Sequence, residues 1–253
     1  MIDSHCHLTD PRLESQLQTV LDRAAANGVS HMITIGTDLD DARRAIGLCR
    51  WHKNVRCAVG VHPNYSQNVA LEDLPALRDI QSDPSVLALG EMGLDYFHHH
   101  ADRDWQHKVF EFQLALATEL ARPVVIHSRE AIDDTLAHLG NFPRVAAVFH
   151  CFTGSLEEAK RILAAGYLLG FTGPITYKKS DELREVVRTM PQERMLVETD
   201  SPYLTPEPMR KLKTNEPAFV KHVAEMVGQV RGWTLEETDA ITTANAGRFF
   251  GWP

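Results

Sequence analysis

Two histidines near the start of the chain stand in a pattern that could bind a metal ion. They lie two residues apart in Ile2-Asp3-Ser4-His5-Cys6-His7, and side chains two apart in a β-strand point to the same face. His5 and His7 could therefore grip one cation from the same side, with Ser4 on the opposite face. Such a pair also occurs by chance, so the interpretation depends on polar residues elsewhere in the chain.

Further candidate ligands stand where later apolar segments end. They are Glu91, His127, His150 and Asp200. Gathering four imidazoles and two carboxylates is costly unless something binds them, and six ligands are too many for one cation. We therefore predict two divalent cations, of Mg²⁺, Mn²⁺ or Zn²⁺, with softer metals favoured by imidazole. His5, His7 and Asp200 would hold one ion. His127 and His150 would hold the other, and Glu91 would bridge the two.

Two such cations suit hydrolysis of a phosphodiester. A pair about 3.5–4 Å apart can hold a hydroxide and clamp a phosphoryl group, and metal binding lowers the pKa of water to about 7. The chain contains no G-x-S-x-G motif, so a metal-bound hydroxide is the predicted nucleophile. Asp200 either takes the proton of the attacking water or acts only as a ligand. Glu198 is predicted to orient a ligand without binding metal itself.

The net charge of −8 disfavours a broad basic face for nucleic acid, so contacts with phosphates must be local. Barrels often bind phosphate near the loops after their last two strands. Lys178-Lys179 and the segment from Arg210 to Lys213 lie there, and Arg129 follows His127 closely. Arg129 and Arg210 are therefore candidate substrate contacts. His62 is either a substrate contact or a turn residue.

Elements that could position these residues alternate along the chain. Short apolar segments of β-type alternate with segments of helical periodicity, and we expect strands at Met1–Cys6, His31–Ile35, Val55–Val61, Val86–Gly90, Pro123–Ile126, Val145–Phe149, Tyr167–Phe171 and Met195–Val197. This alternation predicts a TIM (β/α)₈ barrel, in which active sites lie at the carboxyl ends of the strands. We expect one domain spanning residues 1–253. A doubly wound open sheet is the alternative, weakened by the absence of a Gly-rich dinucleotide motif.

The remaining signals concern the C-terminus and the cellular location. Thr234-Leu-Glu-Glu237 is a capping-box pattern, and it predicts an additional C-terminal helix that ends near Asn245–Gly247. Four cysteines without a C-x-x-C pair indicate free thiols. No apolar segment has membrane-spanning length and no signal peptide is recognisable, so we predict a cytoplasmic protein with no membrane partner. The oligomeric state is left open, and a monomer is compatible with the sequence.

Several motifs together resemble the TatD family of metal-dependent deoxyribonucleases, in the amidohydrolase superfamily. They are Ser4-His5-Cys6-His7-Leu8, Gly60-Val61-His62-Pro63, Gly90-Glu91-Met92-Gly93-Leu94-Asp95-Tyr96, His127-Ser128-Arg129, His150-Cys151-Phe152-Thr153-Gly154 and Glu198-Thr199-Asp200-Ser201-Pro202-Tyr203-Leu204. The resemblance implies a TIM barrel with a two-metal site, the same six ligands, and hydrolysis of DNA phosphodiesters, typically exonucleolytic. DNA or another phosphodiester is thus the expected substrate.

One departure from the family pattern concerns substrate preference. The family commonly has Arg-Gly before Asn-x-Pro, whereas here Lys211-Leu212-Lys213-Thr214 separates Arg210 from Asn215-Glu216-Pro217. Two other functions are therefore kept open. The same metal pair could polarise a carbonyl in an ester, a lactone or an aminoacyl-tRNA. The barrel could also be a binding module without catalysis, although the complete ligand set argues against this.

Overall fold

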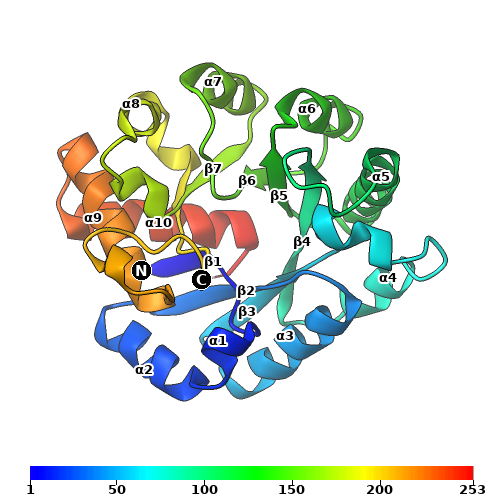
Figure 1. Ribbon diagram of the computed structural model, residues 1–253, viewed down its shortest axis with the longest axis horizontal. Coiled ribbons are helices and arrows are strands. Elements are labelled where there is room, and N and C mark those ends of the chain that lie inside the picture. The colour runs from blue at the N-terminus through cyan, green and yellow to red at the C-terminus, as the bar shows by residue number, and fades with distance from the viewer. Residues whose placement is uncertain (253) are drawn as a thin grey trace. The chain divides into compact units, whose positions relative to one another are not determined.

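The computed structural model describes residues 1–252. This part of the chain forms eight parallel strands, which follow one another in a single sheet in chain order (Figure 1). The strands are β1 (Ile2–Cys6), β2 (His31–Gly36), β3 (Val55–Val59), β4 (Val86–Asp95), β5 (Val124–Arg129), β6 (Ala147–Phe149), β7 (Leu168–Phe171) and β8 (Met195–Val197). Most of their residues are buried on both faces, as expected for parallel strands covered by helices. All eight predicted strands are therefore present.

Helices follow nearly every strand. They are α1 (Pro11–Glu14), α2 (Leu17–Ala26), α3 (Leu39–Trp51), α4 (Ala76–Ile80), α5 (Arg103–Leu120), α6 (Ile132–Gly140), α7 (Leu156–Ala164), α8 (Asp181–Thr189), α9 (Val220–Arg231) and α10 (Leu235–Phe250). The capping box at Thr234 opens α10 as predicted. The predicted end of this helix near Gly247 was wrong. The helix continues to Phe250, and Gly251 ends it in the left-handed conformation that favours glycine.

The chain divides into two compact units, and each is described by itself. Unit 1 contains residues 1–34 and 150–252, and unit 2 contains residues 35–149. In unit 2, strands β3 to β6 pair in parallel, and Figure 1 shows α3, α4, α5 and α6 on one side of these strands. The prediction of one domain over residues 1–253 stays a prediction.

In unit 1 the end of β1 lies beside the segment that follows β8. The N–H of Asp200 donates to the carbonyl of His5 (2.9 Å), and the N–H of His7 donates to the carbonyl of Ser201 (2.7 Å). An isolated parallel bridge also joins Cys6 and Ser201. The first and last strands are therefore neighbours, which is the connectivity of the predicted barrel.

Strand β4 is longer than predicted, because it continues past Gly90 to Asp95. Its pairing with β5 slips between Leu89 and Met92, so that β4 has one extra residue there. This bulge contains Glu91. We had expected Glu91 at the end of the strand, but it lies within the strand. The backbone at Gly93 has a φ of 140°, a conformation that residues other than glycine rarely adopt.

Replacing Gly93 with alanine should destabilise the protein by about 3 kcal/mol or more, because strain and overpacking add. The new Cβ would lie 2.0 Å from the carbonyl oxygen of His127. We expect the thermal midpoint to fall by roughly 10 °C for a chain of this length. Gly47→Ala is the matched control, since Gly47 lies within α3 with nothing near its added Cβ, and helical alanine should raise stability by about 0.5–1 kcal/mol. Equal midpoints for the two variants would contradict this account.

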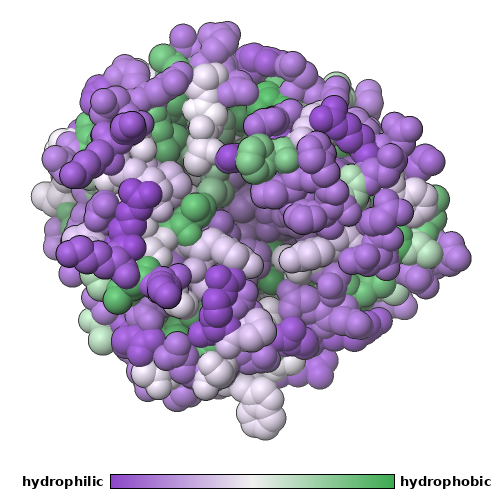
Figure 2. Space-filling model, viewed as in Figure 1, coloured by the Kyte–Doolittle hydropathy of each residue, from purple (hydrophilic) through white to green (hydrophobic). Residues whose placement is uncertain are grey.

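No helix within residues 1–252 is both long enough and apolar enough to cross a bilayer. The face seen in Figure 2 is mostly hydrophilic, and its apolar side chains occur in small separate groups.

Candidate metal centre

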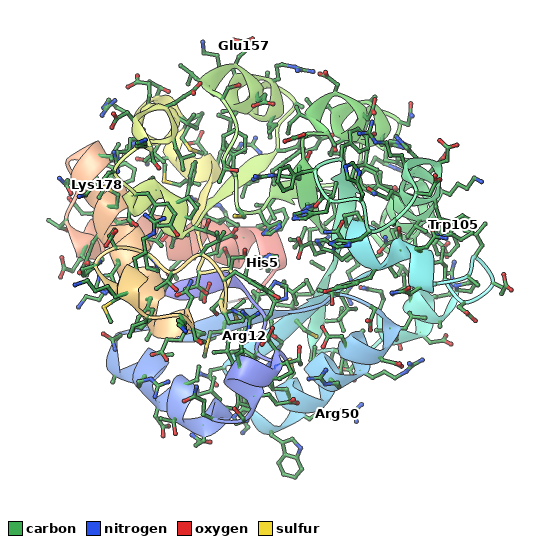
Figure 3. The ribbon with its side chains drawn as sticks, in the orientation of Figure 1. His5, Arg12, Arg50, Trp105, Glu157 and Lys178 are labelled. Carbon is green, nitrogen blue, oxygen red and sulfur yellow. The ribbon has the colours of Figure 1, made fainter. Side chains whose placement is uncertain are left out.

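Three predicted ligands of unit 1 converge at the end of β1. The Nε2 atoms of His5 and His7 lie 3.3 Å apart, and Oδ1 of Asp200 lies 3.6 Å and 3.3 Å from them, respectively. Figure 3 labels His5 on this strand. Ligands bonded to one tetrahedral cation at about 2.1 Å would be separated by about 3.4 Å. The donor atoms of this group therefore fit a divalent cation.

Backbone conformation turns the carboxylate of Asp200 toward these imidazoles. Asp200 has a φ of 54°, a left-handed conformation that aspartate and asparagine tolerate better than most residues. Its side chain is only 13% exposed. Burial by itself would raise the pKa of Asp200, but the hydrogen bond from His7 and the charges of His5 and His150 outweigh it, so the pKa lies below its usual range.

His150 and Glu198 extend this group within unit 1. The ring of His150 stacks on that of His5 at a centroid distance of 3.9 Å, and its Nδ1 lies 3.7 Å from Oε1 of Glu198. Glu198 accepts hydrogen bonds from the N–H of Cys151 (2.6 Å) and from Oγ of Ser4 (3.1 Å). Burial raises the pKa of Glu198 to about 7. This environment is compatible with the predicted orienting role, although these residues could also contribute to a metal site.

The alternation expected along β1 holds for His5 and His7, whose Nε2 atoms lie 3.3 Å apart, but not for Ser4. Ser4 bonds to Glu198, and the ligand atoms of His5 and Glu198 also belong to one close group. Neighbouring residues thus reach the same carboxylate. The reason is a shift in the pairing of β1 with β2 between Asp3 and Cys6, because an extra residue in one strand interrupts the regular alternation of faces.

The second group lies in unit 2 and contains Glu91, His127 and His62. Oε1 of Glu91 lies 2.9 Å from Nδ1 of His127 and 3.3 Å from Nε2 of His62. The predicted ligands Glu91 and His127 are therefore brought together. The predicted pairing of His127 with His150 joins residues of different units and stays a prediction.

Asp95, which the sequence analysis did not single out, fixes the orientation of His127. Its Oδ2 lies 2.9 Å from Nε2 of His127 and also accepts a bond from Nδ2 of Asn64 (3.2 Å). With the Nε2 proton donated to Asp95, Nδ1 of the neutral His127 ring would present a lone pair to Oε1 of Glu91, which lies 2.9 Å away. Two acceptors this close need a proton or a cation between them. This contact is the feature of unit 2 that best fits a bound metal.

His62 differs from His127 in which ring nitrogen carries the proton. Its Nδ1 accepts from the N–H of Asn64 (3.0 Å), at the start of the 3₁₀ turn Pro63–Asn68. The neutral ring therefore carries its proton on Nε2, the atom that faces Glu91 and His127. A protonated nitrogen donates hydrogen bonds and cannot bind a cation. His62 is thus a turn residue whose Nε2–H is also available to Glu91 or to a substrate oxygen.

The predicted basic contacts are exposed. In unit 1 the guanidinium of Arg210 lies 4.0 Å above the ring of Tyr177, which precedes Lys178, labelled in Figure 3. The two predicted basic loops of that unit are therefore in contact. In unit 2 the guanidinium of Arg129 lies 5.1 Å from the ring centroid of Phe97.

The family model for TatD-related DNases matches residues 2–251. The chain belongs to this family. It is 38% identical to the "uncharacterized metal-dependent hydrolase YabD" of Bacillus subtilis over 99% of its own length and 98% of the relative's. It is 37% identical to the "3'-5' ssDNA/RNA exonuclease TatD" of Erwinia amylovora, over 99% and 100% of the two chains. These matches confirm the predicted family and its enzyme class, a metal-dependent hydrolase.

A solved structure confirms the predicted fold. The TatD homologue YjjV of Escherichia coli superposes with a TM-score of 0.93 at 30% identity, covering 100% of this chain and 98% of that one. This member of the TatD family therefore has the TIM-barrel fold, with α10 as the additional C-terminal helix.

Asp95→Asn should weaken metal binding about 10- to 100-fold, the usual effect of removing a carboxylate that orients a ligating histidine. Asparagine keeps the size of the side chain but holds the Nε2–H of His127 less strongly. The affinity can be measured by titrating metal into chelator-stripped protein. Asp79→Asn, at the edge of α4 in the same unit, serves as the control. Unchanged affinity in Asp95→Asn would show that His127 is oriented by other groups.

Asp3 should make the stability of the metal-free protein depend on pH. It accepts hydrogen bonds from the N–H and Oγ1 of Thr199 (2.8 and 2.6 Å), and burial raises its pKa to about 8. Between about pH 4 and pH 8 the folded state binds a proton that the unfolded state has released, so stability falls as the pH rises. Relative to Asp3→Asn, the free energy of unfolding of the wild type should fall by on the order of 1 kcal/mol for each pH unit in this window. Urea unfolding at pH 5 and pH 7.5 measures this, and parallel changes in both proteins would contradict it.

Proposed function

We propose that this chain is an exonuclease that hydrolyses single-stranded DNA or RNA with two divalent cations. His5, His7 and Asp200 would bind one cation, and His127 and His150 the other, with Glu91 shared between them. The contact that carries the proposal is the 2.9 Å approach of Nδ1 of His127 to the carboxylate of Glu91, which a cation would stabilise. The substrate class is taken from the relative named as a 3'-5' ssDNA/RNA exonuclease.

The bound cations would supply Lewis acidity at the phosphoryl group and lower the pKa of the attacking water. Asp200 would accept the proton of that water at a carboxylate oxygen, which is ionised at neutral pH. The Nε2–H of His62 would donate to a substrate oxygen. Asp95 and Glu198 would hold His127 and His150 in place through the contacts described above.

Basic residues would contact the substrate locally. Arg129 and Arg210 are exposed cations in a chain of net charge −8. Each phosphate that such a residue neutralises makes binding more sensitive to salt. We therefore propose few phosphate contacts and a shallow salt dependence, in keeping with the lack of a broad basic face.

The test is an assay on single-stranded DNA and RNA oligonucleotides labelled at either end. Chelator-stripped protein would be supplied with Mg²⁺, Mn²⁺ or Zn²⁺, and bound metal counted by elemental analysis. We expect stepwise shortening from one end, lost with chelator and restored by metal. A panel of carboxylic esters and lactones run in parallel tests the alternative. Turnover of that panel alone, or cleavage that resists chelation, would refute the proposal.

A further inference from the structure

An aromatic side chain without a role in the chemistry above stands beside Arg129, the proposed phosphate contact of unit 2. Phe97 is 50% exposed and lies two residues after the end of β4. The guanidinium of Arg129, the last residue of β5, lies 5.1 Å from its ring centroid, within the range of a cation–π contact.

The same carboxylate that orients His127 also fixes the backbone of Phe97. Oδ1 of Asp95 accepts hydrogen bonds from the N–H groups of Phe97 (3.1 Å) and His98 (2.8 Å), while Oδ2 bonds to His127 (2.9 Å). Asp95 and Arg129 are also partners in the pairing of β4 with β5. The backbone that carries the aromatic ring is therefore fixed by the same carboxylate that contacts His127.

Arg129 is not neutralised by a carboxylate. Among residues 1–252 its guanidinium has no ion pair, and its contact is the face of Phe97. The other ring contact of Phe97 is polar as well, an edge-on approach of His98 with centroids 4.8 Å apart. A docking surface for another protein would surround the exposed ring with apolar groups. A single ring bordered by one guanidinium and one imidazole instead has the size and polarity of a nucleotide-binding surface.

We propose that Phe97 and Arg129 form a stacking surface for one base of a single-stranded substrate, next to the cluster of Glu91 and His127. The inference rests on the proposed nuclease function and names residues that would bind the substrate. Aromatic stacking binds any base, because every base has a π-face, and it suits an enzyme that degrades strands of any sequence. Arg129 would add stacking or charge to the same nucleotide.

The experiment compares intact oligonucleotides with ones that carry a single abasic residue, placed successively along the strand. In the wild type, an abasic residue at one position should raise KM about tenfold. Phe97→Ala should raise KM for the intact strand by a similar factor, with kcat within about twofold, and should show no further loss at that position. Phe97→Trp should restore the wild-type KM. Phe97→Leu, which keeps apolar bulk without a ring, covers the case in which Phe97→Ala fails to fold.

The matched control is Trp51→Ala. Trp51 is 86% exposed and ends α3, at the helix end that leads into the start of β3, opposite the strand ends that carry Phe97 and Arg129. The Trp51→Ala variant should leave KM unchanged. Metal content should also be equal in all these variants, since none alters a proposed ligand.

A second readout separates the stacking surface from the nuclease activity. Quenching of a 2-aminopurine base in an oligonucleotide reports stacking with chelator present, when no cleavage occurs. If the wild type cleaves the strand and the Phe97→Ala variant keeps the wild-type KM and quenching, the stacking surface would be overturned. The proposed function would remain intact. A higher KM in Arg129→Gln but not in Phe97→Ala, equal for intact and abasic strands, would also overturn the stacking surface. Arg129 would then be a phosphate contact. Quenching that depends on Phe97 without any cleavage would support the surface and refute the nuclease.

Discussion

Replacing Glu91 with alanine should remove nearly all hydrolysis and leave fewer than one metal ion per chain. Glu91 is buried, and its Oε1 lies 2.9 Å from Nδ1 of His127 and 3.3 Å from Nε2 of His62. As the proposed shared ligand it would bind both cations, so its loss should weaken both. Metal-centred stabilisation of the transition state is worth several kcal/mol, so the rate should fall at least about a thousandfold.

Elemental analysis and single-turnover rates test this prediction together. The control is Glu72→Ala, which removes an exposed glutamate of the same unit and should leave both quantities unchanged. Two ions retained per chain would show that Glu91 is not the shared ligand. One ion retained, with the other lost, would make Glu91 a ligand of a single cation.

Asp200→Asn should lower kcat by about 10²- to 10⁴-fold, the usual contribution of a positioned proton acceptor. Asparagine is the informative replacement because Asp200 has a φ of 54°, and asparagine tolerates this left-handed conformation. The backbone bond to His5 should therefore survive, and the effect of charge is separated from that of shape.

Metal content and pH profile distinguish the two roles that the sequence left open for Asp200. If the residue accepts the proton, the variant should keep metal and lose the acidic limb of its pH–rate profile. If it is only a ligand, the variant should lose metal, and excess metal should restore the rate. Wild-type kcat with full metal content would exclude both roles.

The strand pattern could be predicted because parallel strands are short, apolar on both faces and separated by recognisable helix signals. Side-chain parity was less reliable. The bulge in β4 and the register shift in β1 each change which residues share a face, and both depend on pairing with a neighbouring strand. The alternation of apolar and polar residues in a single sequence contains no information about that pairing. The place of Glu91 inside a long strand therefore could not be predicted.

Asp95 and His62 show a second limit of sequence reasoning. Asp95 was missed because β4 was expected to end at Gly90, which placed the aspartate in a loop. Its position within the quoted Gly90–Tyr96 motif was the one available signal. For His62, the choice between substrate contact and turn residue depended on which ring nitrogen accepts the Asn64 N–H. Such tautomer preferences follow from three-dimensional contacts alone.

The length of β4 has a consequence for how such enzymes can diversify. The strand supplies Glu91 inside its bulge and Asp95 at its end, so a deletion or insertion between them would disturb a candidate ligand and the orientation of His127 at once. His99 and His100 follow in an exposed stretch, beyond His98, whose N–H and Nδ1 still contact Asp95. Natural variation in substrate choice should therefore accumulate as changes of length and composition in this loop, while the spacing between the two carboxylates stays fixed.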